Sequence, residues 1–274
     1  MNWRPSPFLI GSGLFHLAVF ALWAWHPEFW GVYLLALVAN HAAITLAGLL
    51  PRCALLGENL TRLPEAAVQA GLVAITIDDG PDPEVTPRVL ALLAAHGAKA
   101  SFFCIGERLA AHPELAREIV AAGHAIENHG ERHHALNSLK GPGGWRREVL
   151  DAQASIVRIT GRLPRFYRPT AGLRNPFLTP VLQAHGLRLA SWTRRGFDTR
   201  CTDPAQVLSR LTRDLAGGDI LLLHDGNAAR TASGEPLILE VLPRLLEAIE
   251  AAALRTARLD EAVEKPSAQG LSQA

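Results

Sequence analysis

Short apolar runs alternate with helical patterns from residue 72 onward, and this alternation constrains the fold more than any other feature of the sequence. The β-branched run at 72–77 leads into Asp-Asp-Gly-Pro at 78–81, which is typical of a buried strand ended by a turn. A helical pattern at 86–96 follows, with Gly97 just past its end. Strands buried on both faces and separated by helices predict a parallel sheet, either closed as a barrel or open and doubly wound.

The same pattern continues to residue 259. Further strands are predicted at 99–105, 124–129, 165–168, 187–193, 219–223 and 255–259, and further helices at 113–122, 145–160, 176–185, 203–216 and 236–253. No short-period sequence repeat accompanies the alternation, which argues against a solenoid. We therefore expect an α/β domain over 72–263, followed by a disordered tail at 264–274 that is rich in Ser, Gln and Gly.

The first fifty residues have a different character. Two uncharged apolar runs, at 8–25 and 30–50, are each long enough to cross a bilayer as a helix of roughly 20 residues. Aromatic side chains gather around the turn between them, as in the aromatic belt of a membrane interface. We predict a membrane hairpin over 1–51, with 52–71 as a linker or a cap on the next domain. A signal peptide is the competing interpretation, but no small-x-small cleavage site follows the first run.

Positive charge near the hairpin predicts its orientation. Arg4 precedes the first run, Arg52 and Arg62 follow the second, and the turn carries neither Lys nor Arg. The positive-inside rule then places both ends and the domain that follows in the cytoplasm, as a two-helix protein of the inner or cell membrane. Polar residues within the runs, His16, Asn40 and His41, are expected to form hydrogen bonds between the helices or to lie at the membrane interface, rather than to mark a functional polar site.

Composition excludes some classes of partner. The formal charge is +1 and no dense basic block is present, so nucleic acid is not an expected partner, and no protein partner is predicted. The bilayer is an expected partner because of the hairpin. The three cysteines, Cys53, Cys104 and Cys201, are too few and too widely spaced for a disulfide framework, which favours a reducing compartment.

Polar residues follow most of the predicted strands. Active sites of parallel α/β folds lie at the carboxyl ends of the strands, so these side chains are the candidates for chemistry. They are Asp78, Asp79, His129, His133, Arg168, Asp198 and His224.

Three of these candidates form a plausible metal site. His129-x-x-x-His133 is a weak motif alone, but both histidines follow a strand that a parallel fold brings beside Asp79. Two imidazoles and one carboxylate leave positions open for water and substrate, which is typical of a catalytic metal. We therefore predict Asp79, His129 and His133 as metal ligands.

The remaining candidates are assigned to proton transfer. Asp78 is the expected general base toward water activated by the metal, held in place by a bidentate pair with Arg168. His224 is the expected general acid for the leaving amine, with Asp198 fixing its tautomer. The competing interpretations are a simple turn for the paired aspartates, a structural ion pair for Arg168 and a core histidine for His224.

Taken in order, five motifs resemble those of the polysaccharide deacetylase (NodB-homology) family. They are Thr76-Ile-Asp-Asp-Gly-Pro81, His129-x-x-x-His133, Arg168-Pro-x-x-Gly172, Asp198 and Leu222-Leu-His-Asp225, and the resemblance covers about 72–263. It implies a distorted (β/α)7 barrel and a divalent metal, with Zn²⁺ expected first and Co²⁺ or Ni²⁺ as alternatives. The implied reaction removes an N-acetyl or other N-acyl group from an amino sugar in a polysaccharide or lipid-linked glycan.

The motifs also depart from the family pattern. Gly130 replaces a hydroxyl residue, Ala171 a bulky one, Arg195 an acid and Thr199 a tryptophan. Ala171, through a nearby backbone N–H, and Trp192 are expected to contact the oxyanion or the substrate. Two other functions compete: a deacylase or deformylase acting on a lipid-linked sugar precursor at the cytoplasmic face of the membrane, and a glycan-binding protein with a decayed catalytic site.

Overall fold

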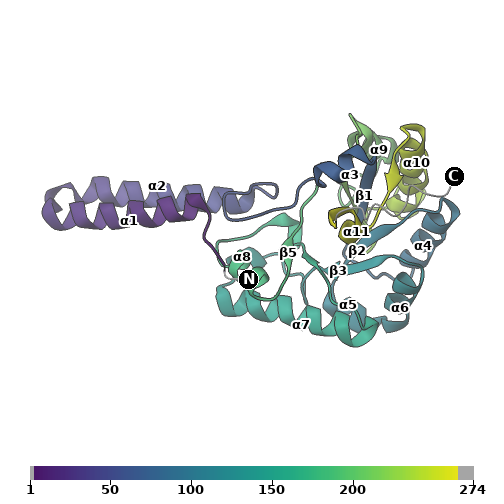
Figure 1. Cartoon of the computed structure of the whole chain (residues 1–274), viewed down its shortest axis with the longest axis horizontal. Coiled ribbons are helices and arrows are strands. Elements are labelled where there is room, and N and C mark those ends of the chain that lie inside the picture. The colour runs from purple at the N-terminus through teal and green to yellow at the C-terminus, as the bar shows by residue number, and fades with distance from the viewer. Residues whose placement is uncertain (1–2, 265–274) are drawn as a thin grey trace.

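A long helical hairpin projects from an α/β body in the computed structural model, which describes residues 3–264 (Figure 1). Helices α1 (Pro7–Trp25) and α2 (Trp30–Leu49) are joined by the short 3-10 helix η1 (Pro27–Phe29). The observed helices agree with the two predicted runs to within one residue at each end. The turn lies at the end of the hairpin farthest from the body.

Most of the hairpin surface is apolar and exposed. Only 11% of the α1 window and 17% of the α2 window are buried, so these helices are not packed in a soluble core. By length and composition both could cross a membrane or, near the N-terminus, act as a signal sequence. Between the helices, the Ser12 hydroxyl donates to Asn40 Oδ1 at 2.7 Å, which agrees with the predicted interhelical bonding of Asn40.

The body is built around a curled parallel sheet. In chain order its strands are β1 (Leu72–Asp78), β2 (Ala100–Cys104), β3 (Ala125–Asn128), β4 (Phe166–Tyr167), β5 (Arg188–Leu189), β6 (Arg194–Arg195), β7 (Ile220–His224) and β8 (Arg255–Thr256). Their order in the sheet is β5-β4-β3-β2-β1-β7-β6, with β8 added to the start of β1. The predicted α/β barrel-like fold is confirmed.

The strand predicted at 187–193 is corrected to two short strands. β5 pairs with β4 at one end of the sheet order, and β6 pairs with β7 at the other. Only residues 190–193 connect them, so the end of β5 and the start of β6 are five residue steps apart and lie within about 18 Å of each other. The two ends of the sheet therefore lie close together, and this segment closes the curl into a distorted barrel.

Helices cover the outside of the barrel (Figure 1). The larger ones are α4 (Thr86–Ala95), α6 (Pro113–Ala121), α7 (Pro142–Thr160), α8 (Leu178–Ala184), α9 (Pro204–Thr212) and α10 (Leu237–Ala251). The apolar faces of α4, α6, α9 and α10 pack on β1, β2 and β7, whose side chains are almost wholly buried. Helix α8 packs with α7 against β4 and β5. The sequence did not predict the short helices α3 (Glu65–Gln69), α5 (Gly106–Ala111) and α11 (Leu259–Val263).

The hairpin joins the body through direct contacts with the loop that follows β4. The Arg174 N–H donates to the Gly48 carbonyl at 3.0 Å, and a Cβ at Gly48 would lie 2.1 Å from the Arg174 oxygen. Pro51 packs against Gly172 so closely that a Cβ on Gly172 would lie 2.5 Å from the proline ring. The backbones meet too tightly there for larger side chains.

Residues 52–71 pack as a cap rather than forming a loose linker. Leu63 and Ala67 are buried, and the Leu60 N–H donates to the Leu189 carbonyl at 3.0 Å. At the other end of the chain, the predicted disordered tail lies outside the described residues except for Glu264, which forms an ion pair with Arg165.

Candidate active site

The carboxyl ends of the central strands bring the predicted residues together. β1 lies between β2 and β7, and its last residue, Asp78, is aligned with His224 at the end of β7. β3 ends just before His129. A cavity of about 230 Å³ opens at this edge, and its lining includes Asp78, Asp79, His129, His133, Ala171, Trp192 and His224. Arg168 and Asp198 lie behind this lining, each in contact with one of its members.

The three predicted ligands converge on one point. Asp79 Oδ1 lies 3.2 Å from His129 Nε2 and 3.1 Å from His133 Nε2. His129 Nδ1 is 2.7 Å from the Arg168 carbonyl, which can only accept, so Nδ1 carries the proton of the neutral ring. His129 Nε2 then presents a lone pair toward a carboxylate oxygen that is buried and has no hydrogen-bond partner.

This arrangement fits a divalent cation. Ligands about 2.0 Å from a tetrahedral metal are about 3.3 Å apart, close to the observed separations from Asp79 Oδ1. The ligand atoms of Asp79, His129 and His133 all lie within 4.8 Å of one another. A buried oxygen without a donor is costly unless something positive satisfies it. Within the described residues, this is the one cluster with metal-ligand geometry.

Electrostatics favour the ionised carboxylate of Asp79 and the neutral ring of His133, which are the protonation states that bind a metal. Burial alone would raise the pKa of Asp79, but its close contact with His129 and the charges of His133 and His224 lower it below the ordinary range. Burial, with the charge of His129, lowers the pKa of His133 to about 4, so its ring is neutral at physiological pH. Burial opposes charge on His129, yet Asp78 and Asp79 raise its pKa, which shows that the site attracts positive charge.

Three residues of the cavity have left-handed backbone conformations. They are Asp79 at φ 74°, His133 at φ 53° and Ala171 at φ 53°. Such conformations cost of order 1 kcal/mol or more for residues other than glycine, and they cluster at functional sites. Here they turn the two ligands and the Ala171 backbone toward the cavity.

Asp78 is positioned by a fully buried arginine. Arg168 Nη1 donates to Asp78 Oδ1 at 2.6 Å, while its Nη2 donates to the Ser191 carbonyl at 2.7 Å. The expected bidentate pair is therefore wrong, because the second arm of the guanidinium serves the backbone. Asp78 Oδ2 is left 3.7 Å from His129 Nε2, next to the ligand cluster.

His224 and Asp198 form a second buried pair. Asp198 Oδ1 is 2.9 Å from His224 Nδ1, and Asp198 Oδ2 accepts the His224 backbone N–H at 2.7 Å. Nε2 is therefore the ring nitrogen left to act in the cavity. Burial favours the neutral ring, but the charge and hydrogen bond of Asp198 outweigh it, assisted by Asp78 and Asp79, and raise the pKa of His224 to about 9.

Replacing Asp198 with asparagine should move the alkaline limit of activity to lower pH. The pKa of His224 is raised above its ordinary value of 6.5, so the ion pair stabilises the fold fully below pH 6.5, and this stabilisation is lost as pH rises through about 9. Without the charge of Asp198, burial dominates and the pKa falls. We expect the alkaline limb of kcat to shift down by about two pH units. A pH–rate profile checks this, and an unchanged limb would show that His224 is not the acid.

Two residues that support the ligands had no signal in the sequence. Glu148 Oε1 in α7 accepts the backbone N–H groups of Arg132 at 2.9 Å and His133 at 3.2 Å, which holds the loop that carries the second histidine. Asn227 Nδ2 donates to Asp79 Oδ2 at 2.9 Å. Gly130 has φ 85°, and a Cβ there would lie 2.8 Å from Glu148 Oε1, which explains the absence of a side chain.

The chain is similar to proteins of one known family. The polysaccharide deacetylase family model matches residues 65–190. A peptidoglycan-N-acetylglucosamine deacetylase of Bacillus cereus is 32% identical over 177 residues, which cover 64% of this chain and 81% of that protein. The chain belongs to the polysaccharide deacetylase family. A chitooligosaccharide deacetylase of Azorhizobium caulinodans is 34% identical over 56% of this chain and 73% of that relative.

The family resemblance extends to solved structures. A family 4 carbohydrate esterase pseudoenzyme from Bacillus anthracis aligns with a TM-score of 0.67 and 21% identity, covering 76% of this chain and 69% of that chain. At that identity the likeness shows the fold alone. The two relatives above are named as deacetylases of N-acetylglucosamine-containing or chitooligosaccharide glycans, and the prediction of a carbohydrate deacetylase is confirmed at that level.

Proposed function

We propose that this family member is a membrane-anchored, metal-dependent hydrolase that removes an N-acetyl group from an amino sugar in a polysaccharide or lipid-linked glycan. One observation supports the metal: Asp79 Oδ1 is buried, receives no hydrogen bond from any residue that the structure describes, and faces the Nε2 atoms of His129 and His133. When bound there, a divalent cation supplies a Lewis acid that lowers the pKa of water and polarises a carbonyl. Zn²⁺ suits one carboxylate and two imidazoles, and Co²⁺ or Ni²⁺ are alternatives.

The residues around the ligands carry the proton transfers. Asp78, held at Oδ1 by Arg168, takes a proton from the attacking water at Oδ2. The Ala171 segment, in its left-handed turn, borders the cavity where a backbone N–H can donate to the developing oxyanion. His224, held by Asp198, gives a proton to the departing nitrogen. The C–N bond breaks, and water has been divided between acetate and a free amine.

Acetate release and metal content together test this function. We expect purified full-length protein to carry about one divalent ion per chain and to release acetate from an N-acetylglucosamine oligomer or a lipid-linked N-acetylglucosamine. Elemental analysis and an acetate assay measure the two quantities. Binding of the glycan without acetate release, in protein that holds its metal, would instead establish a binding protein with a decayed site.

The hairpin is proposed to anchor the enzyme in the membrane, with residues 1–51 as the anchor and 72–263 as the catalytic domain. Exposed apolar helices of bilayer length support an anchor, because water would otherwise solvate their side chains. With Arg4 and Arg52 flanking it, both of its ends should face the cytoplasm. A green fluorescent protein fused to the C-terminus should then fluoresce and an alkaline phosphatase fusion should be inactive. The reverse pattern would place the domain outside.

A further inference from the structure

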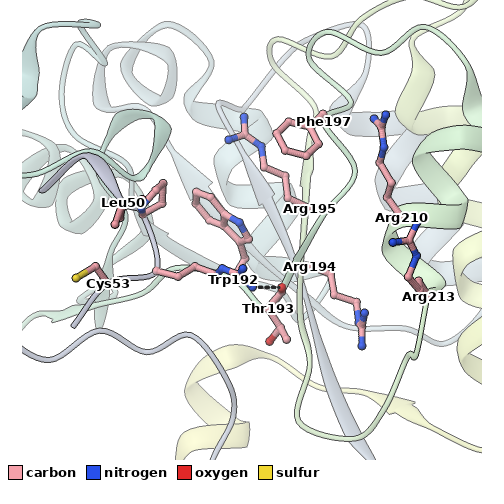
Figure 2. A pocket seen from close by; sticks show the side chains of 11 residues that line it. Leu50, Cys53, Trp192, Thr193, Arg194, Arg195, Phe197, Arg210 and Arg213 are labelled. Atoms are coloured by element: carbon pink, nitrogen blue, oxygen red, sulfur yellow. Dashed lines mark hydrogen bonds between the residues drawn. The ribbon is translucent and has the colours of Figure 1, made fainter. Parts of the chain in front are cut away.

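A second, larger cavity lies between the end of the hairpin and the catalytic cavity. Its volume is about 810 Å³, and none of the residues that line it is acidic (Figure 2). Five arginines line it: Arg52, Arg194, Arg195, Arg210 and Arg213. Arginine forks bind phosphate and carboxylate oxygens in pairs of hydrogen bonds, so the lining is suited to an anion.

Four of these five arginines have no carboxylate partner among the residues that the structure describes. Arg194 is neutralised by Asp219 at 2.5 Å and Arg52 donates to the Thr193 carbonyl at 3.0 Å. Arg210 donates to the Gly196 carbonyl at 3.1 Å. Across residues 3–264, no ion pair within 4.0 Å involves Arg195, Arg210 or Arg213. With Arg52, four cations around one cavity have no carboxylate beside them and repel each other, and an anion between them removes that cost.

Arg195 connects this cavity to the site of catalysis. Its side chain and that of Trp192 line both cavities. The guanidinium lies 5.4 Å from the ring centroid of Trp192 and 5.0 Å from that of Phe197, and its buried Nε has no hydrogen-bond partner (Figure 2). The aromatic rings fix the cation in place while leaving its donors free. A substrate could therefore place its amide at Asp79 and an anionic group beside Arg195.

The wall opposite Arg195, Arg210 and Arg213 comes from the chain that leaves the hairpin. Leu50 and Cys53 belong to it, directly after α2 ends at Leu49 (Figure 2). Leu50 is 59% exposed and Phe197 is 49% exposed, so apolar groups border the cationic lining. If α2 crosses the bilayer, the cavity lies at the level of lipid phosphates. The combination fits an anion attached to a lipid chain.

We propose that this cavity binds the phosphate group of a lipid-linked amino sugar, with the lipid leaving along the hairpin and the sugar reaching the catalytic cavity. The inference rests on the proposed deacetylase function and names its substrate class. Phosphate is the recognised chemistry, and Arg195, Arg210 and Arg213 are its donors. The substrate is thus a phosphoester of a membrane lipid rather than a neutral polymer.

Three substrates compared on full-length protein in detergent micelles test this assignment. They are N-acetylglucosaminyl farnesyl phosphate, N-acetylglucosamine 1-phosphate and neutral octyl N-acetylglucosaminide. We expect kcat/KM to be highest for the first. In the double variant Arg210→Gln/Arg213→Gln, kcat/KM for the lipid phosphate should fall about 10- to 100-fold more than kcat/KM for the octyl glycoside. The control Arg146→Gln/Arg188→Gln removes two exposed charges elsewhere and should not change that ratio.

The outcomes separate the possible failures. Equal losses on all three substrates would overturn the phosphate site, and equal preference for the soluble phosphate would overturn the lipid part. Calorimetric titration with farnesyl phosphate reports binding without hydrolysis: binding that the double variant weakens at least about 10-fold supports the cavity even if no acetate is released. If phosphatidylglycerol vesicles displaced farnesyl phosphate, the cavity would be a general site for anionic lipids, and the proposed substrate class would be wrong. The double variant Arg210→Lys/Arg213→Lys keeps both positive charges, so it should retain part of the preference for the lipid phosphate over the octyl glycoside. It also provides a second test of the cavity if the glutamine variant fails to fold.

Discussion

Asp78→Asn is expected to lower kcat by about 10²- to 10⁴-fold while the protein keeps its metal. The amide cannot accept a proton from water at neutral pH, yet its oxygen can still accept the hydrogen bond that Arg168 now gives to Asp78 Oδ1. Asp79, His129 and His133 are untouched, so the metal-to-protein ratio should equal that of the wild type. Acetate release and elemental analysis of the same preparation measure both quantities.

Stability has to be separated from chemistry in that variant. Arg168 is fully buried, and removing the charge that balances it can cost about 3–5 kcal/mol. Its hydrogen bonds to Thr76, Ala190 and Ser191 limit that cost. Thermal unfolding should therefore accompany the assay, at a temperature where both proteins are folded. Asp151→Asn, which changes an exposed carboxylate of α7, is the matched control. If the folded Asp78→Asn variant turned over substrate at the wild-type rate, Asp78 would not be the general base.

His129→Ala should remove the metal itself and reduce activity to background. Altering residues around a metal ligand already costs about 10- to 100-fold in affinity, and loss of a ligand costs at least as much. His129 is also the more buried of the two histidines, with 2% of its side chain exposed against 19% for His133. The variant should bind less than a tenth of the wild-type metal after dialysis, and added Zn²⁺ should restore little activity.

The neighbouring histidine supplies the control for this prediction. His134 is exposed, lies outside the ligand cluster and should be replaceable by alanine with full metal content and activity. Treatment of the wild type with a chelator should reproduce the His129→Ala phenotype, and Zn²⁺, Co²⁺ or Ni²⁺ should reverse it. If His129→Ala kept its metal, the cation would have to be bound elsewhere.

The sequence predicted the central strands and the ligand cluster because both depend on local patterns. The predicted strands ended next to Asp78 and at His129, and the parallel topology brings such ends to one edge. The split of 187–193 into β5 and β6 had no local signal, because the position of the break depends on which neighbours close the barrel. The single bond from Arg168 to Asp78 was likewise set by distant carbonyls that compete for its other donors.

Support from remote parts of the chain was the least predictable part of the site. Glu148 lies in the middle of a helix and acts on the histidine loop through two backbone N–H groups. The arginine cavity draws its charges from the hairpin end, from β6 and from α9 and the residue after it, so no basic block marks it in the sequence. Only the folded chain collects them.

The tight junction between hairpin and body also limits where the enzyme can work. Gly48 meets Arg174 backbone to backbone and Pro51 meets Gly172, so no long tether lets the catalytic cavity swing away from the helices. As the membrane anchor proposed above, such a hairpin would fix the height of the cavity above the lipid surface and reduce the search for substrate to diffusion in two dimensions. Distance from the bilayer would then determine substrate choice. A sugar held close to the bilayer would reach the cavity, and a sugar farther along a polymer would not.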